Sequence, residues 1–124
     1  MSKTITAPNA PAAVGPYCHA KQVGNTLYTS GQIGLIPSTG ELPQGVEAQA
    51  AQAMDNLKAV LRAAGMGMED VVKTTVFLTD INDFAAINAI YATYFPSDPP
   101  ARSCVQAAAL PKAALFEIEA VAAK

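Results

Sequence analysis

The chain has 124 residues, of which 51% are apolar and 15% are charged, and its formal net charge is −2. This composition excludes intrinsic disorder and predicts a single domain, residues 1–124, with a large buried surface. The acidic balance and the lack of a basic run argue against a nucleic-acid-binding protein. Because so small a domain has few charged side chains for its surface, the composition favours a homo-oligomer.

Motifs for cofactors, metals and membranes are missing from the sequence. Its two cysteines, Cys18 and Cys104, are too few for a disulfide scaffold. No apolar segment approaches the length of a membrane span, and the N-terminus has no apolar signal core. Clustered His and Cys ligands and phosphate-binding or dinucleotide-binding glycine motifs are also missing. We therefore expect a cytoplasmic protein with reduced thiols that uses no metal or other cofactor.

The first third of the chain predicts short strands and long loops. Lys3–Thr6 is a strand candidate, and a loop rich in Pro, Ala and Asn follows and ends at Gly15-Pro16-Tyr17. The segments 18–23 and 27–30 flank Gly24-Asn25-Thr26, which is a hairpin signal. Glycines and prolines punctuate the chain from there to position 45, which predicts another loop.

The middle of the chain predicts two amphipathic helices around one central strand. Val46 to Ala64 places apolar residues on one helical stripe, and Gly65 marks its end. Val71 to Thr79 is rich in β-branched residues and predicts a buried strand. Asp80 and Asp83 are residues that begin helices. Apolar residues at helical spacing follow them up to Pro96, namely Phe84, Ile87, Tyr91 and Tyr94.

The last quarter predicts two strands with unusual charges. The first follows Pro99-Pro100 and places Arg102 and Cys104 on one face. The second, near 116–121, alternates Glu117 and Glu119 with apolar residues. The predicted order is thus β-β-β-α-β-α-β-β, in which crossovers allow the third, fourth and fifth strands to run parallel. Two helices cover only one face, so we expect the other face, with Arg102, Glu117 and Glu119, to meet water or another subunit.

Each candidate residue has a structural and a functional interpretation. Arg102 fits either a surface salt bridge or a bidentate clamp for a carboxylate ligand. Glu117 and Glu119 fit either interface contacts or, at one of them, a carboxylate that orients water and transfers a proton. Tyr17 fits either ordinary packing or a phenol offered to a ligand. Ser30-Gly31 fits a strand end that presents backbone N–H groups to an anion.

Two further side chains receive no catalytic role. His19 is the only histidine, and no Ser/His/Asp or Cys/His set surrounds it at a known spacing. Cys104 shares a strand face with Arg102 and fits inert packing rather than a nucleophile.

Six motifs together resemble the reactive intermediate deaminase (RidA/YjgF) family, in order and over essentially the whole chain. They are Ala10-Pro-Ala-Ala-Val-Gly-Pro-Tyr17, Thr29-Ser-Gly-Gln-Ile33, Lys73-Thr-Thr-Val-Phe77, Asp80-Ile-Asn-Asp-Phe84, Pro100-Ala-Arg-Ser-Cys-Val105 and Phe116-Glu-Ile-Glu-Ala-Val121. The resemblance implies a chorismate-mutase-like α+β fold, a mixed six-stranded sheet with two helices on one face, and a homotrimer with ligand clefts between subunits. It also implies cofactor-free hydrolysis of 2-iminopropanoate and 2-iminobutanoate to 2-keto acids and ammonia.

The resemblance also assigns the site. Glu117, Arg102 and Tyr17 would be catalytic, and Arg102, Cys104, Ser30, Gly31 and Asn88 would bind substrate. The segment Pro96–Pro100 is shorter than in some members, which leaves the fine substrate preference open.

The strand order allows one geometric hypothesis about these residues. The last two strands are joined by a short loop and should run antiparallel, which would separate Arg102 and Glu117 by about 16 Å or more within one chain. Each cleft would then take Arg102 and Cys104 from one subunit, and Tyr17, Ser30, Gly31 and Glu117 from its neighbour. Two alternative functions are a non-catalytic module that binds 2-keto acids and a ribonuclease or translation inhibitor, the second disfavoured by the acidic charge.

Overall fold

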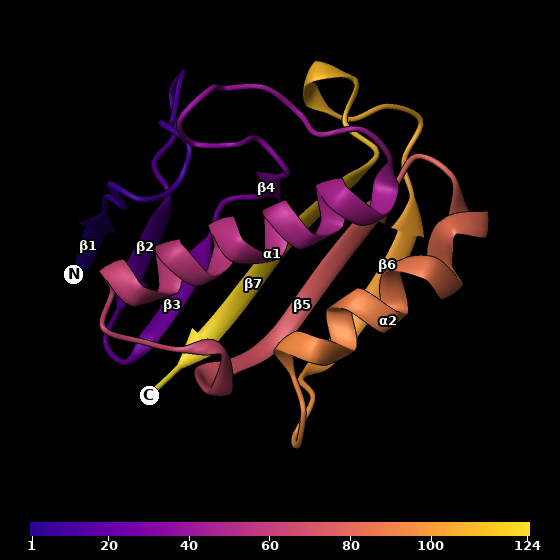
Figure 1. Ribbon diagram of the computed structural model, residues 1–124. Coiled ribbons are helices and arrows are strands. Elements are labelled where there is room, and N and C mark those ends of the chain that lie inside the picture. The colour runs from indigo at the N-terminus through magenta and orange to yellow at the C-terminus, as the bar shows by residue number, and fades with distance from the viewer.

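The strands form one mixed sheet in the order β1-β2-β3-β7-β5-β6, and both helices lie on the same side of it (Figure 1). The structure is a computed structural model that describes residues 1–124. Its elements are β1 (Ser2–Ile5), β2 (Ala20–Val23), β3 (Thr26–Thr29), β4 (Gln32–Ile33), α1 (Val46–Ala63), β5 (Val71–Leu78), α2 (Phe84–Tyr94), β6 (Ala101–Gln106) and β7 (Phe116–Ala123). The α+β class, the order of the main elements and the placement of the helices are confirmed. No helix is both long and apolar enough to cross a membrane.

The last strand of the chain lies in the middle of the sheet. β7 is antiparallel to β3 on one side and to β5 on the other, and β5 pairs with β6 in parallel. β3, β5 and β6 therefore run in one direction, as the crossovers predict, although β7 separates the first two. The last two strands are antiparallel but not neighbours, because β5 lies between them.

The sheet has seven strands rather than six. The extra strand, β4, has only two residues and pairs with β7 at Ile118 and Glu117. It falls in the loop rich in Gly and Pro, where two residues are too few to show strand periodicity. Its pairing brings the segment after β3 alongside the start of β7.

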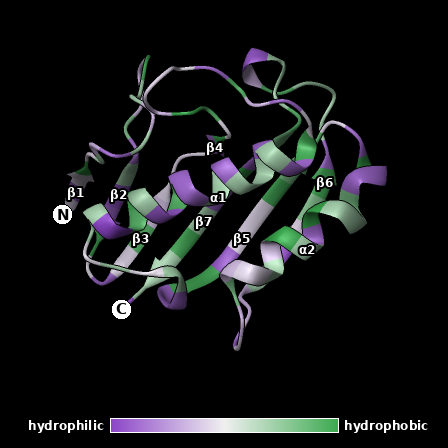
Figure 2. Cartoon of the chain, in the orientation of Figure 1, coloured by the Kyte–Doolittle hydropathy of each residue, from purple (hydrophilic) through white to green (hydrophobic).

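The core lies between the two helices and the sheet. Met54, Leu57 and Leu61 of α1 are fully buried against the strands, as are Val76 of β5 and Ile118 of β7. Figure 2 shows the hydrophobic colour on the strands beneath the helices. The apolar stripe of α1 therefore packs against the sheet, as its periodicity predicts. The helix ends just before Gly65, whose φ of 75° suits a residue without a Cβ.

The other face of the sheet has no covering layer within the chain. Along β7, Phe116, Ile118 and Ala120 are buried, whereas Glu119 between them is exposed and Glu117 is only half-buried. The uncovered face also exposes Tyr28 by 51% and Val105 by 44%. Such a partly apolar surface is typical of a face that meets another subunit.

Candidate active site

Arg102 lies on the edge strand β6 and points to the helical side of the sheet. Its Nη1 donates a hydrogen bond of 2.7 Å to Oδ1 of Asn88 on α2. Its guanidinium carbon lies 5.1 Å from the ring centroid of Phe84 and 4.7 Å from that of Tyr91. The planar cation is therefore held by cation–π contacts with two rings and by one amide.

One face of α2 supplies all three of these contacts. Phe84, Asn88 and Tyr91 are four and three residues apart, a spacing that places them together on a helix. The Tyr91 hydroxyl also makes a 2.7 Å hydrogen bond with Thr74 Oγ1 on β5, directly opposite Arg102 in the strand register. The central strand thereby fixes the ring against which Arg102 packs.

Cys104 shares this side of the sheet and packs against the hydrophobic core. Burial raises the pKa of its thiol, and the nearby positive charge of Arg102 opposes that effect only in part. A thiol with a raised pKa is a poor nucleophile. The structure therefore agrees with the interpretation of Cys104 as a packing residue whose backbone lies beside Arg102.

The second group of candidate residues lines a cavity of about 660 Å³. Four residues named from the sequence, Tyr17, Ser30, Gly31 and Glu117, border it together. Its other lining residues are Pro11, Ala12, Val14, His19, Gln32, Ile33, Leu35, Pro111 and Lys112. Loops therefore build most of the cavity, and β7 contributes the carboxylate.

Glu117 is the only acidic residue that lines this cavity. Burial raises its pKa, and the like charge of Glu119 two residues along the strand raises it further. A Cβ on Gly31 would overlap Glu117 Oε2, so only glycine leaves room for the carboxylate in this position. A partly desolvated carboxylate of this kind is a suitable proton acceptor for a water molecule.

Ser30 and Tyr17 differ in how firmly they are held. Ser30 Oγ donates a 2.6 Å hydrogen bond to the carbonyl of Cys18, and its N–H donates to the carbonyl of His19 at 2.9 Å. Its hydroxyl is therefore engaged, in agreement with the missing nucleophile motif. Tyr17 is 52% exposed, and its phenol projects from the loop between β1 and β2.

Two buried amides of α1 fix the walls around this cavity. Asn56 Nδ2 donates to the carbonyls of Ile33 and Leu35 at 3.0 and 2.9 Å. Gln49 Oε1 accepts from the N–H of Leu115, two residues before Glu117, at 2.8 Å. The sequence interpretation missed both amides, although Gln49 and Asn56 are seven residues apart and interrupt the apolar stripe of the helix.

Lys112 is another lining residue that the sequence interpretation missed. Its φ of 56° places it in the left-handed region, and Ala113 follows with a φ of 57°. Two consecutive non-glycine residues in this region are uncommon and conformationally costly. They form the turn that brings the chain into β7 beside the cavity.

The two groups of residues lie on opposite faces of the sheet. Across β5, Arg102 is in register with Thr74 and Glu117 with Phe77, and neighbouring residues of a strand alternate between its faces. The expectation that Arg102 shares the open face with Glu117 and Glu119 is therefore wrong. The pairing of both strands with β5 decides their faces, and this pairing cannot be read from either strand alone.

Arg102 and Glu117 of one chain are nevertheless far apart. Two strand spacings of about 4.8 Å separate the residues laterally, and three residues of register add about 10 Å along the strands. The sheet itself also stands between the two side chains. The contacts thus define an Arg102 half-site (Arg102, Cys104, Asn88, Phe84 and Tyr91) and a Glu117 half-site (Glu117, Tyr17, Ser30 and Gly31).

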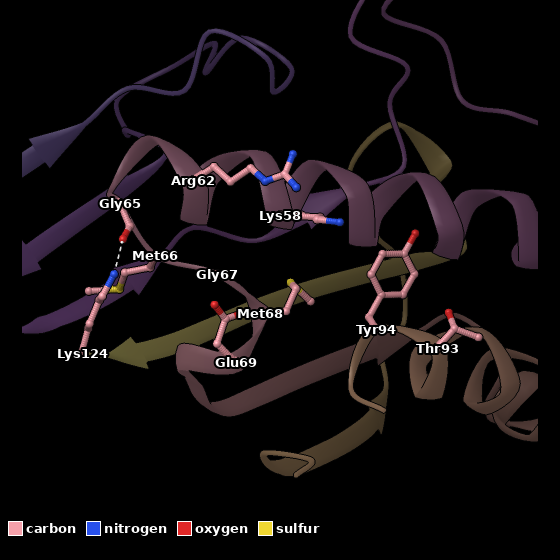
Figure 3. A pocket seen from close by; sticks show the side chains of 10 residues that line it. All are labelled: Lys58, Arg62, Gly65, Met66, Gly67, Met68, Glu69, Thr93, Tyr94 and Lys124. Carbon is pink, nitrogen blue, oxygen red and sulfur yellow. Dashed lines mark hydrogen bonds between the residues drawn. The ribbon is translucent and has the colours of Figure 1, made fainter. Parts of the chain in front are cut away.

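A second hollow, of about 670 Å³, contains none of the residues predicted for the site. Figure 3 shows Lys58 and Arg62 extending along α1, while Lys124 donates to the carbonyl of Gly65 at 3.0 Å. The three cations do not converge on one point, and Glu69 adds a negative charge among them. In the whole chain, no group of three His, Cys, Asp or Glu side chains is arranged to hold a metal ion.

Known proteins match this chain over nearly its whole length. The family model described as Endoribonuclease L-PSP matches residues 7–124. The 2-iminobutanoate/2-iminopropanoate deaminase of Escherichia coli (strain K12) is 54% identical over 100% of this chain and 99% of that protein.

Two solved structures extend the agreement to the fold. RidA from the Antarctic bacterium Psychrobacter sp. has a TM-score of 0.96 and 48% identity, covering 98% of this chain and 99% of that chain. Escherichia coli TdcF with bound serine has a TM-score of 0.95 and 46% identity, covering 98% of each chain. The chain therefore belongs to the Endoribonuclease L-PSP family, which is the RidA/YjgF family that its sequence motifs resemble.

Proposed function

We propose that this protein hydrolyses reactive 2-imino acids, among them 2-iminopropanoate and 2-iminobutanoate, to 2-keto acids and ammonia. The observation that carries the proposal is a positioned guanidinium without a carboxylate partner, combined with a carboxylate whose pKa is raised by burial. These are the two groups that such a reaction needs, one for the substrate carboxylate and one for water. The name of the relative that is 54% identical over the whole chain supports the same activity.

Arg102 binds the substrate carboxylate in this mechanism. Its Nη1 is engaged by Asn88, which leaves its other nitrogens to donate to the two carboxylate oxygens. The backbone N–H of Cys104 adds a further donor beside it. The bound serine in the similar TdcF structure supports a ligand that has a carboxylate.

Glu117 activates water against the imine carbon. Its carboxylate accepts a proton as the water oxygen attacks, and Tyr17 or a second water gives a proton to the imine nitrogen. Glu117 then returns its proton to the amino group of the resulting carbinolamine, which leaves as ammonia. The hydroxyl proton passes back to Tyr17 or the second water, and the 2-keto acid remains. Such imines also hydrolyse without a catalyst, so holding water and substrate in place supplies much of the required acceleration.

The active site in this proposal is shared between subunits of a homotrimer. Within one chain, a small acid cannot contact both Arg102 and Glu117, because the sheet separates them. Each cleft therefore takes the Arg102 half-site of one subunit and the Glu117 half-site of the next. The uncovered, partly apolar sheet face supports association with further copies of the chain.

A competition assay tests the proposed activity. A threonine dehydratase generates 2-iminobutanoate in the presence of semicarbazide, which traps the imine, and the purified protein is added. We expect the semicarbazone yield to fall and free 2-oxobutanoate to rise with the protein concentration. An unchanged semicarbazone yield at concentrations equal to those of the dehydratase would refute imine hydrolysis.

The alternative of a keto-acid-binding module makes a different prediction for Glu117. In a hydrolase, Glu117→Ala removes turnover and spares binding of 2-oxobutanoate, whereas Arg102→Ala removes both. A pure binding module has no turnover in the wild-type protein, so Glu117→Ala has no rate to change. The net charge of −2 disfavours RNA as the substrate, and strongly salt-dependent RNA binding would revive that alternative.

A further inference from the structure

The only histidine of the chain is buried and uses both ring nitrogens. The N–H of Ala7 donates to His19 Nδ1 at 2.8 Å, so this nitrogen carries no proton. The proton therefore lies on Nε2, which donates to the carbonyl of Pro11 at 2.7 Å. The two contacts fix the ring as the neutral Nε2–H tautomer.

These contacts join the loop between β1 and β2 to the wall of the cavity. This loop, residues 6–19, carries Tyr17, and the ring of His19 binds it at two backbone positions. The carbonyl of His19 accepts from the N–H of Ser30, and the neighbouring carbonyl of Cys18 accepts from the Ser30 hydroxyl. His19 thus connects the loop that carries the phenol with the strand end that carries Ser30.

We propose that His19 is a positioning residue whose ring, bound to Ala7 and Pro11, holds the Tyr17 loop in place at the wall of the cavity. This inference rests on the proposed function, because that function gives Tyr17 its role. The physical reason is the cost of leaving buried polar groups without partners. Without the ring, the N–H of Ala7 loses its acceptor and the carbonyl of Pro11 loses its donor.

Few other charged or titratable groups surround the ring. They are Tyr17 and Cys18 on the same segment, Glu117 on β7 and Lys112 in the turn before β7. Residues 6–13, which pack against the ring, have no titratable side chain. The charges Asp55, Lys58 and Arg62 of α1 border a separate hollow with Pro8 and Asn9.

Nuclear magnetic resonance of the tag-free protein tests the hydrogen bonds directly, because a single histidine gives one set of ring signals. We expect ring ¹⁵N shifts of the Nε2–H tautomer. In His19→Ala, the amide signals of Ala7 and Tyr17 should move away from their wild-type positions. An Nδ1–H tautomer, or Ala7 and Tyr17 amides that do not move in His19→Ala, would overturn the inference.

Two variants connect the ring to activity. His19→Gln keeps an adjacent acceptor and donor, whereas His19→Ala removes both. We expect His19→Ala to lower kcat/KM for imine hydrolysis by about 10-fold, because small displacements of reacting groups are costly. His19→Gln should restore most of this activity and return the Ala7 and Tyr17 amide signals toward their wild-type positions.

The division between kcat and KM separates His19 from the groups that bind the substrate. We expect His19→Ala to lower kcat, because the proposed function gives Tyr17 a role in proton delivery, and to leave KM little changed, because Arg102 binds the carboxylate. A change confined to KM, or a His19→Gln variant as slow as His19→Ala, refutes the role of His19. If the wild-type protein hydrolyses no imine, the proposed function fails, and the resonance experiment still decides whether the ring holds the loop.

Discussion

The two half-sites are built in different ways. The Arg102 half-site lies on regular structure, where β6 carries the cation and one face of α2 surrounds it with two rings and an amide. The Glu117 half-site places a single strand residue among loops, and its phenol is 52% exposed. Direct contacts therefore position the Arg102 half-site, whereas the Glu117 half-site depends on loops held by buried amides and by His19.

This difference corresponds to the two tasks of the proposed reaction. Binding a carboxylate requires a guanidinium that is already oriented, because ordering it during binding would weaken affinity. Activating water requires a carboxylate with a raised pKa, which burial and a neighbouring like charge supply at Glu117. Orientation and pKa are set by different surroundings, and separate faces of the sheet provide them.

The largest expected effect comes from separating the half-sites in mixed trimers. Arg102→Ala and Glu117→Gln should each reduce imine hydrolysis by about 100-fold or more. When the two variants are unfolded together and refolded in equal amounts, about one quarter of the clefts should combine two intact halves by random assortment. The competition assay should then recover a corresponding fraction of wild-type activity.

Each variant refolded alone is the control and should stay inactive. Native mass spectrometry establishes that mixed trimers have formed. Mixed trimers without recovered activity would contradict the sharing of clefts between subunits.

Gly31→Ala should have the next largest effect. The added Cβ would overlap Glu117 Oε2 and force the carboxylate to move, so we expect kcat to fall about 10- to 100-fold. Gly40→Ala is a stringent control for substitution of a loop glycine away from the cavity. A Cβ there meets nothing within 4 Å, although the φ of 71° adds a backbone strain that Gly31→Ala lacks. Steady-state kinetics of both variants provides the measurement, and equal activities would show that the position of the carboxylate is not limiting.

Asn88→Ala should have a smaller effect that falls mainly on substrate binding. It removes the acceptor for Arg102 Nη1 but leaves both rings in place, so we expect KM to rise about 3- to 10-fold. The value of kcat should change little, because Asn88 contacts the guanidinium that binds the carboxylate and does not take part in activating water. A fall in kcat with KM unchanged would assign Asn88 a role in the chemical step instead.

Glu119→Gln should have the smallest effect, visible only in the pH profile. Glu117 must be ionised to accept a proton, so activity is lost as the pH falls through its raised pKa. Removing the charge of Glu119 lowers the pKa of Glu117, and the acid side of the profile of kcat should move to lower pH. A shift to higher pH would show that Glu119 stabilises the ionised form.

Periodicity in the sequence was sufficient to predict the positions of the long helix and the long central strand. The helix from Val46 is observed to Ala63, one residue short of the prediction, and the strand from Val71 ends at Leu78 rather than Thr79. The hairpin is tighter than expected, because Val23 pairs with Thr26 and leaves only Gly24 and Asn25 in the turn. A long apolar pattern indicates a helix or strand whichever segments pack beside it. The ends of helices and strands, and the turns, depend on local pairing.

The site, like the fold, has some features that the sequence indicates and others that only the structure shows. Tyr17, Ser30, Gly31 and Glu117, which the sequence interpretation placed in one half of the cleft, border one cavity. The positions of Phe84 and Tyr91 in the stripe of α2 were also evident, but their contacts with Arg102 were not. A helical stripe shows which residues share a face, and only the neighbouring strand shows what that face meets.

The sequence by itself determined the element types, the two amphipathic helices and the residues that resemble those of the family, because spacing and composition act locally. The tertiary structure decided that β7 inserts between β3 and β5, that Arg102 and Glu117 lie on opposite faces, and that the ring of His19 binds the backbone of Ala7 and Pro11. Each of these depends on pairings between segments distant in the chain. Strand register assigns every side chain to a face, and a shift of one residue would exchange the two faces.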